Sequence, residues 1–183
     1  RQSIEMVQLK ATDKEISLKF QEDVLDQFQD ITNDDNRIQQ VLINLLSNAI
    51  KFTKPGGTIA LSVFKKEKND NIVVQVEDNG IGIKEEDQGR LFTEYGRIVD
   101  DETILLNPQG VGLGLWICKR FCQEIGDGIS ISSKYNQGTT LTFSIKDYKA
   151  NNTPQSTQES EDQSPVSEIR LKKRFPSIRP THT

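Results

Sequence analysis

Polar residues recur at helical spacing between Asp34 and Thr53, where apolar residues three and four apart predict a long amphipathic helix. Five polar residues fall on one stripe beside the apolar face: Arg37, Gln40, Asn44, Asn48 and Lys51. The stripe contains no acidic residue, although taken alone it also fits an ordinary solvated edge. Asparagine oxygens suit a Mg²⁺ ion that phosphate groups already neutralise. The pattern therefore points to a metal–phosphate site, with Lys51 as a phosphate contact.

Three glycine-containing segments follow. Asp78–Ile83 (DNGIGI) comes after an apolar strand, so a buried Asp78 could accept a hydrogen bond from an amine while Gly80 and Gly82 let a flat ring approach. A tight turn after the strand would explain the same residues without any ligand. Gly110–Leu115 (GVGLGL) enters a predicted helix, where free backbone N–H groups favour an anion. Gly138–Thr140 fits either a hairpin turn or a ligand contact.

Other nucleotide-binding patterns are excluded. The glycine spacing G-x-G-x-G after a loop is not the Rossmann fingerprint, and the sequence has no P-loop motif. The H-R-D and D-F-G motifs of serine/threonine and tyrosine kinases are also missing.

A net charge of -4 argues against a nucleic-acid partner, and the lack of an 18-residue apolar run argues against membrane contact by this segment. Cys118 and Cys122 are interpreted as reduced thiols of a cytoplasmic protein.

The elements that must position these residues alternate along the chain. Strands are predicted at 15–20, 58–64, 72–77, 128–133 and 139–145, and helices at 34–51, within 83–92 and at 112–125. This order predicts an α+β fold, a two-layer sandwich with helices on one face of a mixed, largely antiparallel sheet. The domain is expected at 14–147. Residues 1–13 are expected to end a linker or helix from an upstream segment, and 148–183 to form a disordered polar tail with a basic cluster at 170–174.

Taken together, five segments in order resemble the boxes of the ATP-binding catalytic domain of sensor histidine kinases, members of the GHKL superfamily. They are NLLSNAIKFT (44–53), DNGIGI (78–83), LFTEYGRI (91–98), GVGLGLWICKRF (110–121) and NQGTTLTF (136–143). The resemblance covers about residues 14–147. It implies the Bergerat ATP-binding fold, with ATP and Mg²⁺ as the cofactors.

The resemblance also implies roles for single residues. Asn48 would be the main Mg²⁺ ligand and Asn44 its helper, Lys51 and Arg97 would contact phosphate, and Asp78 would accept from the adenine amine. Residues 98–109 would form a mobile lid. The remaining implied nucleotide contacts are Gly80, Ile81, Gly82, Ile83, Tyr95, Gly110, Val111, Gly112, Leu113, Gly114, Leu115, Thr139 and Thr140.

The implied reaction is transfer of the γ-phosphoryl group of ATP to a histidine in two-component phosphorelay signalling. The implied partners are a histidine-bearing dimerisation domain and a response-regulator receiver domain. The only histidine, His182, lies in the polar tail, so the acceptor is expected outside this chain. The parent could be a cytoplasmic protein or a membrane-bound sensor with this part in the cytosol.

Two alternatives remain open. The first is another GHKL-superfamily ATPase, but those enzymes place a general-base Glu four residues before the Mg²⁺ asparagine, where this chain has Asn44. An amide cannot act as a base. The second alternative is a non-catalytic nucleotide-binding module that regulates a partner.

Overall fold

Five strands form the main sheet of the computed structural model, which describes residues 2–20, 31–66, 71–98, 103, 106, 111–148 and 167–169. The strand order is β1-β3-β4-β6-β5. The bounds are β1 Ser17–Phe20, β3 Thr58–Lys65, β4 Ile72–Asp78, β5 Ile129–Lys134 and β6 Gly138–Ile145. β1 pairs in parallel with β3 and the other neighbours pair antiparallel. The predicted mixed, largely antiparallel sheet is therefore confirmed.

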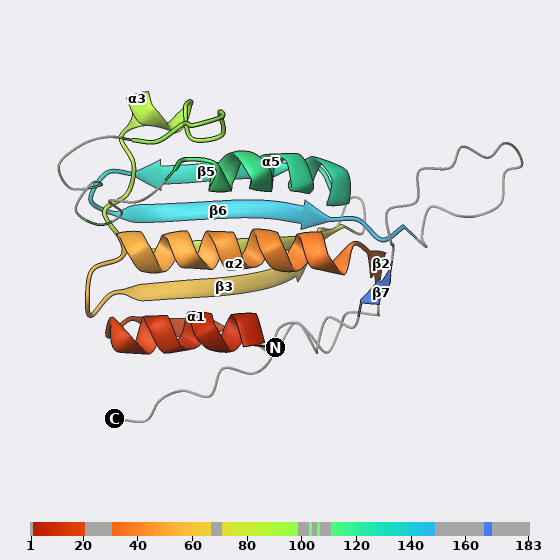
Figure 1. Ribbon diagram of the computed structural model, residues 1–183, viewed down its shortest axis with the longest axis horizontal. Helices are drawn as coiled ribbons and strands as arrows, with labels where there is room; N and C mark the ends of the chain where they lie inside the picture. Colours follow the sequence, from red (N-terminus) through yellow and green to blue (C-terminus); the bar gives the residue numbers. More distant parts are fainter. Residues whose placement is uncertain are drawn as a thin grey trace, which may run out of the picture.

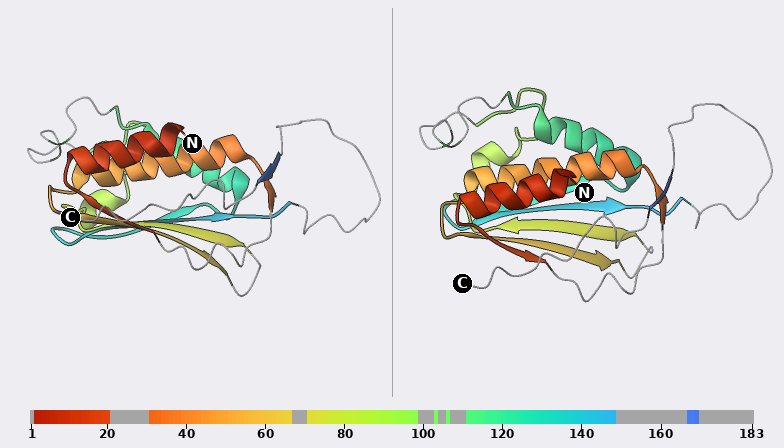
Figure 2. Two further views of the ribbon diagram at one scale, coloured as in Figure 1. Left: turned by 90° about the horizontal axis from the view of Figure 1, so that it is seen from below. Right: turned by 60° about the horizontal axis from the view of Figure 1, so that its bottom comes forward.

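Three helices cover one face of this sheet, as Figures 1 and 2 show. They are α1 Gln2–Asp13, α2 Asp35–Phe52 and α5 Gly114–Ile125. A short helix, α3 Glu85–Gln88, follows β4. The core lies between the helices and the sheet, and its largest fully buried side chains include Leu45, Ile59, Ile125 and Phe143. The two-layer α+β architecture predicted from the sequence is thus confirmed.

Helix α2 carries the polar stripe along the edge of its buried face. Its apolar residues at three- and four-residue spacing are all buried: Ile38, Val41, Leu42, Leu45, Leu46 and Ala49. The Asp34 side chain accepts from the Arg37 backbone N–H at 3.0 Å, which caps the helix start. Asn44, Asn48 and Lys51 are half-buried. These three side chains are therefore partly shielded from solvent.

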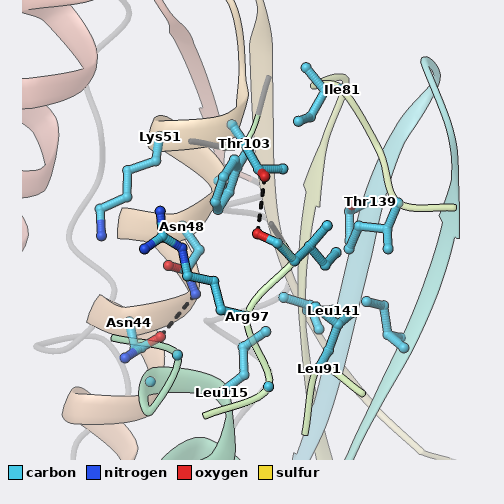
Figure 3. A pocket seen from close by; sticks show the side chains of 18 of the residues that line it. Asn44, Asn48, Lys51, Ile81, Leu91, Arg97, Thr103, Leu115, Thr139 and Leu141 are labelled. Carbon is cyan, nitrogen blue, oxygen red and sulfur yellow. Dashed lines mark hydrogen bonds between the residues drawn. The ribbon is translucent and has the colours of Figure 1, made fainter. Parts of the chain in front are cut away.

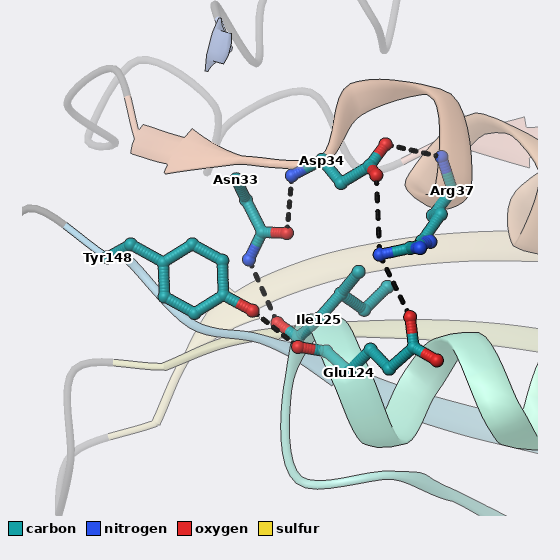
Figure 4. A network of polar contacts seen from close by, with 6 residues as sticks. All are labelled: Asn33, Asp34, Arg37, Glu124, Ile125 and Tyr148. Atoms are coloured by element: carbon teal, nitrogen blue, oxygen red, sulfur yellow. Dashed lines mark hydrogen bonds and ion pairs between the residues drawn. The ribbon is translucent and has the colours of Figure 1, made fainter. Parts of the chain in front are cut away.

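A polar network joins the start of α2 to the end of α5 (Figure 4). The fully buried Asn33 side chain donates to the Ile125 and Lys146 carbonyls at 2.9 and 2.7 Å and accepts from the Asp34 N–H. The Arg37 guanidinium lies 2.8 Å from the Glu124 carboxylate. The network holds α2 and α5 together at one end, which fixes how their other ends approach each other.

Two short strands, β2 Ile31–Asn33 and β7 Ser167–Ile169, were not predicted. They pair antiparallel with each other. β7 lies within the tail predicted to be disordered, so that prediction is wrong for these three residues. The prediction rested on the lack of apolar side chains to bury, but backbone pairing with β2 needs few of them. The basic cluster at 170–174 and the rest of the tail after 148 lie outside the described residues.

Helix α1 ends in a Schellman motif, with Glu15 where glycine is usual. The Ile16 N–H donates to the Ala11 carbonyl at 2.8 Å and the Glu15 N–H to the Thr12 carbonyl at 2.9 Å. Ile16 and Ala11 are both buried, which supplies the apolar contact that accompanies this motif. Glu15 has a φ of 58°, in the left-handed region.

We expect Glu15→Gly to raise the free energy of unfolding by about 0.5–1 kcal/mol, because glycine adopts this φ without the Cβ clash. The Glu15 side chain is exposed, so its removal should cost little stability. Urea denaturation measures the change. Glu77→Gly, a glycine introduced within strand β4, is the control and should destabilise. A midpoint for Glu15→Gly at or below the wild-type value would contradict the assignment of strain.

Candidate active site

A cavity of about 270 Å³ opens between the C-terminal half of α2, the end of β4, the start of α5 and β6. Many predicted site residues line it: Asn44, Asn48, Lys51, Asp78, Ile81, Gly82, Ile83, Arg97, Val111, Gly112, Leu113, Gly114, Leu115 and Thr139. These residues come from segments far apart in the sequence. The fold therefore gathers residues of all five segments that the sequence singled out into one site.

The polar side of the cavity is formed by α2 and Arg97 (Figure 3). The Asn48 side-chain amide donates through Nδ2 to Asn44 Oδ1 at 3.0 Å. This bond fixes the orientation of the Asn48 amide and does not involve its Oδ1 acceptor. Lys51, one turn later, and Arg97 bring cationic groups to the same side. The remaining stripe residues, Arg37 and Gln40, do not line the cavity.

The start of α5 closes the cavity beside Asn44. Leu113 occupies the N-cap position and has no side-chain acceptor for the first N–H groups of this helix. Gly114 packs directly on Asn44, since a Cβ at Gly114 would lie 2.6 Å from Asn44 Nδ2. Because these first N–H groups have no side-chain acceptor, the start of α5 can bind an anion. Asn44 is confined between this helix end and Asn48.

The opposite side of the cavity is apolar and surrounds one carboxyl group, that of Asp78. The apolar side chains that line the cavity include Ile81 from the loop after β4, Leu91 from the segment before Arg97, Leu115 from α5 and Leu141 from β6 (Figure 3). This arrangement provides a largely apolar space next to a buried carboxyl group.

Burial raises the pKa of Asp78 to about 6. Hydrogen bonds from the Gly80 and Thr139 backbones oppose this change, and the neighbouring Glu77 charge adds slightly to it. The Gly80 N–H lies 2.9 Å from Asp78 Oδ1. The hydrogen bond from Gly80 holds the carboxyl group in one orientation, and a group with this pKa is mostly ionised at neutral pH.

Gly82 is required by the loop geometry. Its φ is +62°, and a Cβ there would lie 2.0 Å from the Lys134 carbonyl oxygen. The Asn136 N–H also donates to the Ile81 carbonyl at 2.7 Å. The loop after β4 is thus packed against the β5–β6 turn, which keeps Ile81 and Ile83 at the cavity.

Four predicted contacts are not placed in the lining. Thr140 follows Thr139 on β6 and points to the other face of the sheet, because strand side chains alternate. Tyr95 is 65% exposed, with a left-handed φ of 57°. Gly80 instead holds Asp78 through its backbone. Gly110 and most of the predicted lid lie outside the described residues, although Ile98 and Thr103 line the cavity.

Apart from Ile98 and Thr103 of the predicted lid, some lining residues were not predicted: Ala49, Phe52, Leu91, Gly96, Ile131 and Leu141. Two of them could have been found from periodicity. Leu141 lies two residues after Thr139 and shares its face, and Ile131 pairs with Leu141. Ala49 and Phe52 lie on α2 beside Asn48 and Lys51. Leu91 and Gly96 come from the loop after α3, and local sequence patterns do not encode where that loop lies.

The remaining candidates for chemistry are inert. Burial raises the pKa of the Cys118 thiol to about 12 and that of Cys122 in the same direction, so both stay protonated at neutral pH. The described part of the chain contains no cluster of three or more His, Cys, Asp or Glu side chains suited to a metal. Nor is any helix within it long and apolar enough to cross a membrane.

Comparison with known proteins agrees with this geometry. Residues 33–149 match the model of a family described as histidine kinase-, DNA gyrase B- and HSP90-like ATPases. The chain is 38% identical over 144 residues to the circadian input-output histidine kinase CikA of Synechococcus elongatus. That alignment covers 79% of this chain but only 19% of CikA, so the chain spans about a fifth of this relative.

Two solved structures have the same fold. The catalytic domain of the histidine kinase ThkA aligns with a TM-score of 0.61 and 26% identity, covering 80% of this chain and 88% of that one. Full-length ShkA in complex with AMPPNP aligns with a TM-score of 0.63 and 25% identity, covering 79% of this chain and 28% of ShkA.

Proposed function

Because the chain belongs to the family of histidine kinase-, DNA gyrase B- and HSP90-like ATPases and is an ATP-binding domain of it, we propose that it binds Mg-ATP in this cavity and donates the γ-phosphoryl group to a histidine on a separate helical domain. The observation that carries the proposal is the two-sided cavity. Amide and cationic groups gather on one side, and a single carboxylate in an apolar surround lies on the other.

The apolar side suits the adenine ring. Ile81, Leu91 and Leu141 would pack on its faces and edges, while the Asp78 carboxylate would accept from the exocyclic amine. Guanine carries a carbonyl oxygen at the equivalent ring position. That oxygen would face the carboxylate without a proton between them, so the site should select ATP over GTP.

The polar side suits the phosphates and Mg²⁺. Asn48 would hold the metal through Oδ1, because its Nδ2 is already committed to Asn44. The metal would supply charge neutralisation between the phosphate groups. Lys51 and Arg97 add positive charge on the same side, and the first N–H groups of α5 can donate to phosphate oxygens.

The position of Asn44 favours phosphoryl transfer over hydrolysis. Activation of a water molecule needs a base near the metal. The side chain that would lie beside the metal ligand Asn48 is Asn44, whose amide cannot accept a proton at neutral pH. Its Oδ1 receives the Asn48 hydrogen bond, so we infer that Asn44 orients the metal-binding Asn48. Catalysis would then rest on positioning and charge stabilisation of the transferred group.

The test is an assay with ATP radiolabelled at the γ-phosphate. We expect the chain alone to hydrolyse ATP only slowly and not to label itself. Adding the histidine-bearing domain of its parent protein should produce acid-labile, base-stable phosphate on that domain. The rate should rise with the concentration of the acceptor, because the two partners are not tethered.

A histidine-to-alanine variant of the acceptor domain is the control and should stay unlabelled. Brisk ATP hydrolysis by the chain alone would instead identify a hydrolysing member of the family. Tight ATP binding without transfer to the acceptor would identify a regulatory nucleotide-binding module. Either result would overturn the kinase proposal.

A further inference from the structure

The last turn of α2 is held from two sides. An α-helix leaves its final four carbonyls without partners inside the helix. Here the Ala49 carbonyl accepts from the Thr53 N–H, and the Phe52 carbonyl accepts from the Ile81 N–H at 3.1 Å. The two carbonyls between them, of Ile50 and Lys51, both accept from Lys14 Nζ at 2.8 Å.

Lys14 reaches these carbonyls because of how α1 ends. It is the residue before Glu15 in the Schellman motif, which turns the chain sharply from α1 into β1. A cation at this place is also favoured by the negative end of the α2 dipole. Burial lowers the pKa of the Lys14 ammonium group, in keeping with its partly enclosed position.

The same junction has two further ties to the end of α2. The Gly56 N–H donates to the Glu15 carbonyl at 3.0 Å, and the Ser17 N–H donates to the Gly57 carbonyl at 2.9 Å. The turn after α2 is thus clamped by the segment that connects α1 to β1. Lys51 and Phe52, in the clamped turn, and Ile81, on its other side, all line the cavity.

We propose that Lys14 is a positioning residue of the nucleotide site, which fixes the turn that presents Lys51 and Phe52 and thereby couples helix α1 to ATP binding. Lys14 does not line the cavity, so it would act through α2. A displacement of α1 would withdraw the ammonium group and loosen this turn. The inference rests on the proposed binding of ATP in this cavity.

The test is a double-mutant cycle between Lys14→Met and Lys51→Met, with the ATP dissociation constant measured by calorimetry well below the unfolding temperature. We expect Lys14→Met to weaken binding about three- to tenfold in the wild-type background, from the loss of two hydrogen bonds. In the Lys51→Met background the loss should be smaller, since part of the effect passes through Lys51.

Two variants sharpen the comparison. Lys14→Arg keeps donors that can reach both carbonyls and should recover part of the affinity. Lys10→Met removes an exposed lysine one turn earlier on α1 and should bind ATP like the wild type. Equal losses for Lys14→Met in the two backgrounds, or wild-type affinity in a folded Lys14→Met protein, would overturn the inference while leaving the proposed function intact.

A second test uses the wild-type protein and so does not depend on the folding of any variant. Because coupling is reciprocal, saturation with a non-hydrolysable ATP analogue should slow hydrogen exchange of the Ser17 and Gly56 amides. Unchanged exchange at both amides despite bound analogue would overturn the inference. A wild-type chain that does not bind the analogue at all would overturn the proposed function, and this inference with it.

Discussion

Asp78→Asn is expected to weaken ATP binding roughly 10- to 100-fold while making the free protein more stable at pH 7.5. The asparagine would turn either a donor or a poorer acceptor toward the adenine amine, so binding should lose its preference for ATP over GTP. Calorimetry with both nucleotides measures this. A variant that prefers ATP as strongly as the wild type would show that Asp78 does not read the base.

The gain in stability follows from the raised pKa. Burial raises the Asp78 pKa to about 6, whereas an unfolded aspartate titrates near pH 4. Between these values the folded wild type holds a proton that the unfolded chain releases, so its stability falls as the pH rises from about 4 to about 6. Asparagine has no such proton to lose.

Denaturation at several pH values separates this effect from others. The variant should gain about 1–3 kcal/mol above pH 6, and the gain should vanish near pH 4. Glu77→Gln removes an exposed carboxylate next to Asp78 on β4, and it should leave ATP affinity near the wild-type value. A gain in stability that does not depend on pH would contradict the role of burial.

Asn48→Ala is expected to lower the rate of phosphoryl transfer at least about a hundredfold, because the proposed metal ligand is removed. Asn44→Ala should cost only about tenfold, since the loss is one orienting hydrogen bond. Raising the Mg²⁺ concentration should restore much of the activity of Asn44→Ala but not that of Asn48→Ala.

Gln40→Ala is the matched control for both variants. Gln40 lies one turn before Asn44 on the same stripe, but it is exposed and does not line the cavity, so the variant should transfer phosphate at the wild-type rate. If Asn44→Ala and Asn48→Ala lose equal activity and respond equally to Mg²⁺, both asparagines are ligands. That outcome would agree with the family resemblance and contradict the orienting role inferred for Asn44.

Local sequence patterns predicted most of the elements and the polar stripe of the site, and the family resemblance implied the remaining contacts. The period of α2 placed Asn44, Asn48 and Lys51 on one stripe, and strand and hairpin patterns located all five strands of the main sheet. Such patterns are visible because helix and strand geometry is set by residues close in sequence. The pairing of β2 with β7 was not predicted, since two three-residue strands give almost no periodic signal.

Tertiary structure decided which members of each pattern share the site. Arg37 and Asn48 lie on the same stripe, but Arg37 pairs with Glu124 near the far end of α5 while Asn48 faces the cavity. The environment of Asp78 and the reach of Lys14 to the end of α2 also required the folded chain. Burial and contacts between distant segments determine these properties, and no spacing within one segment encodes them.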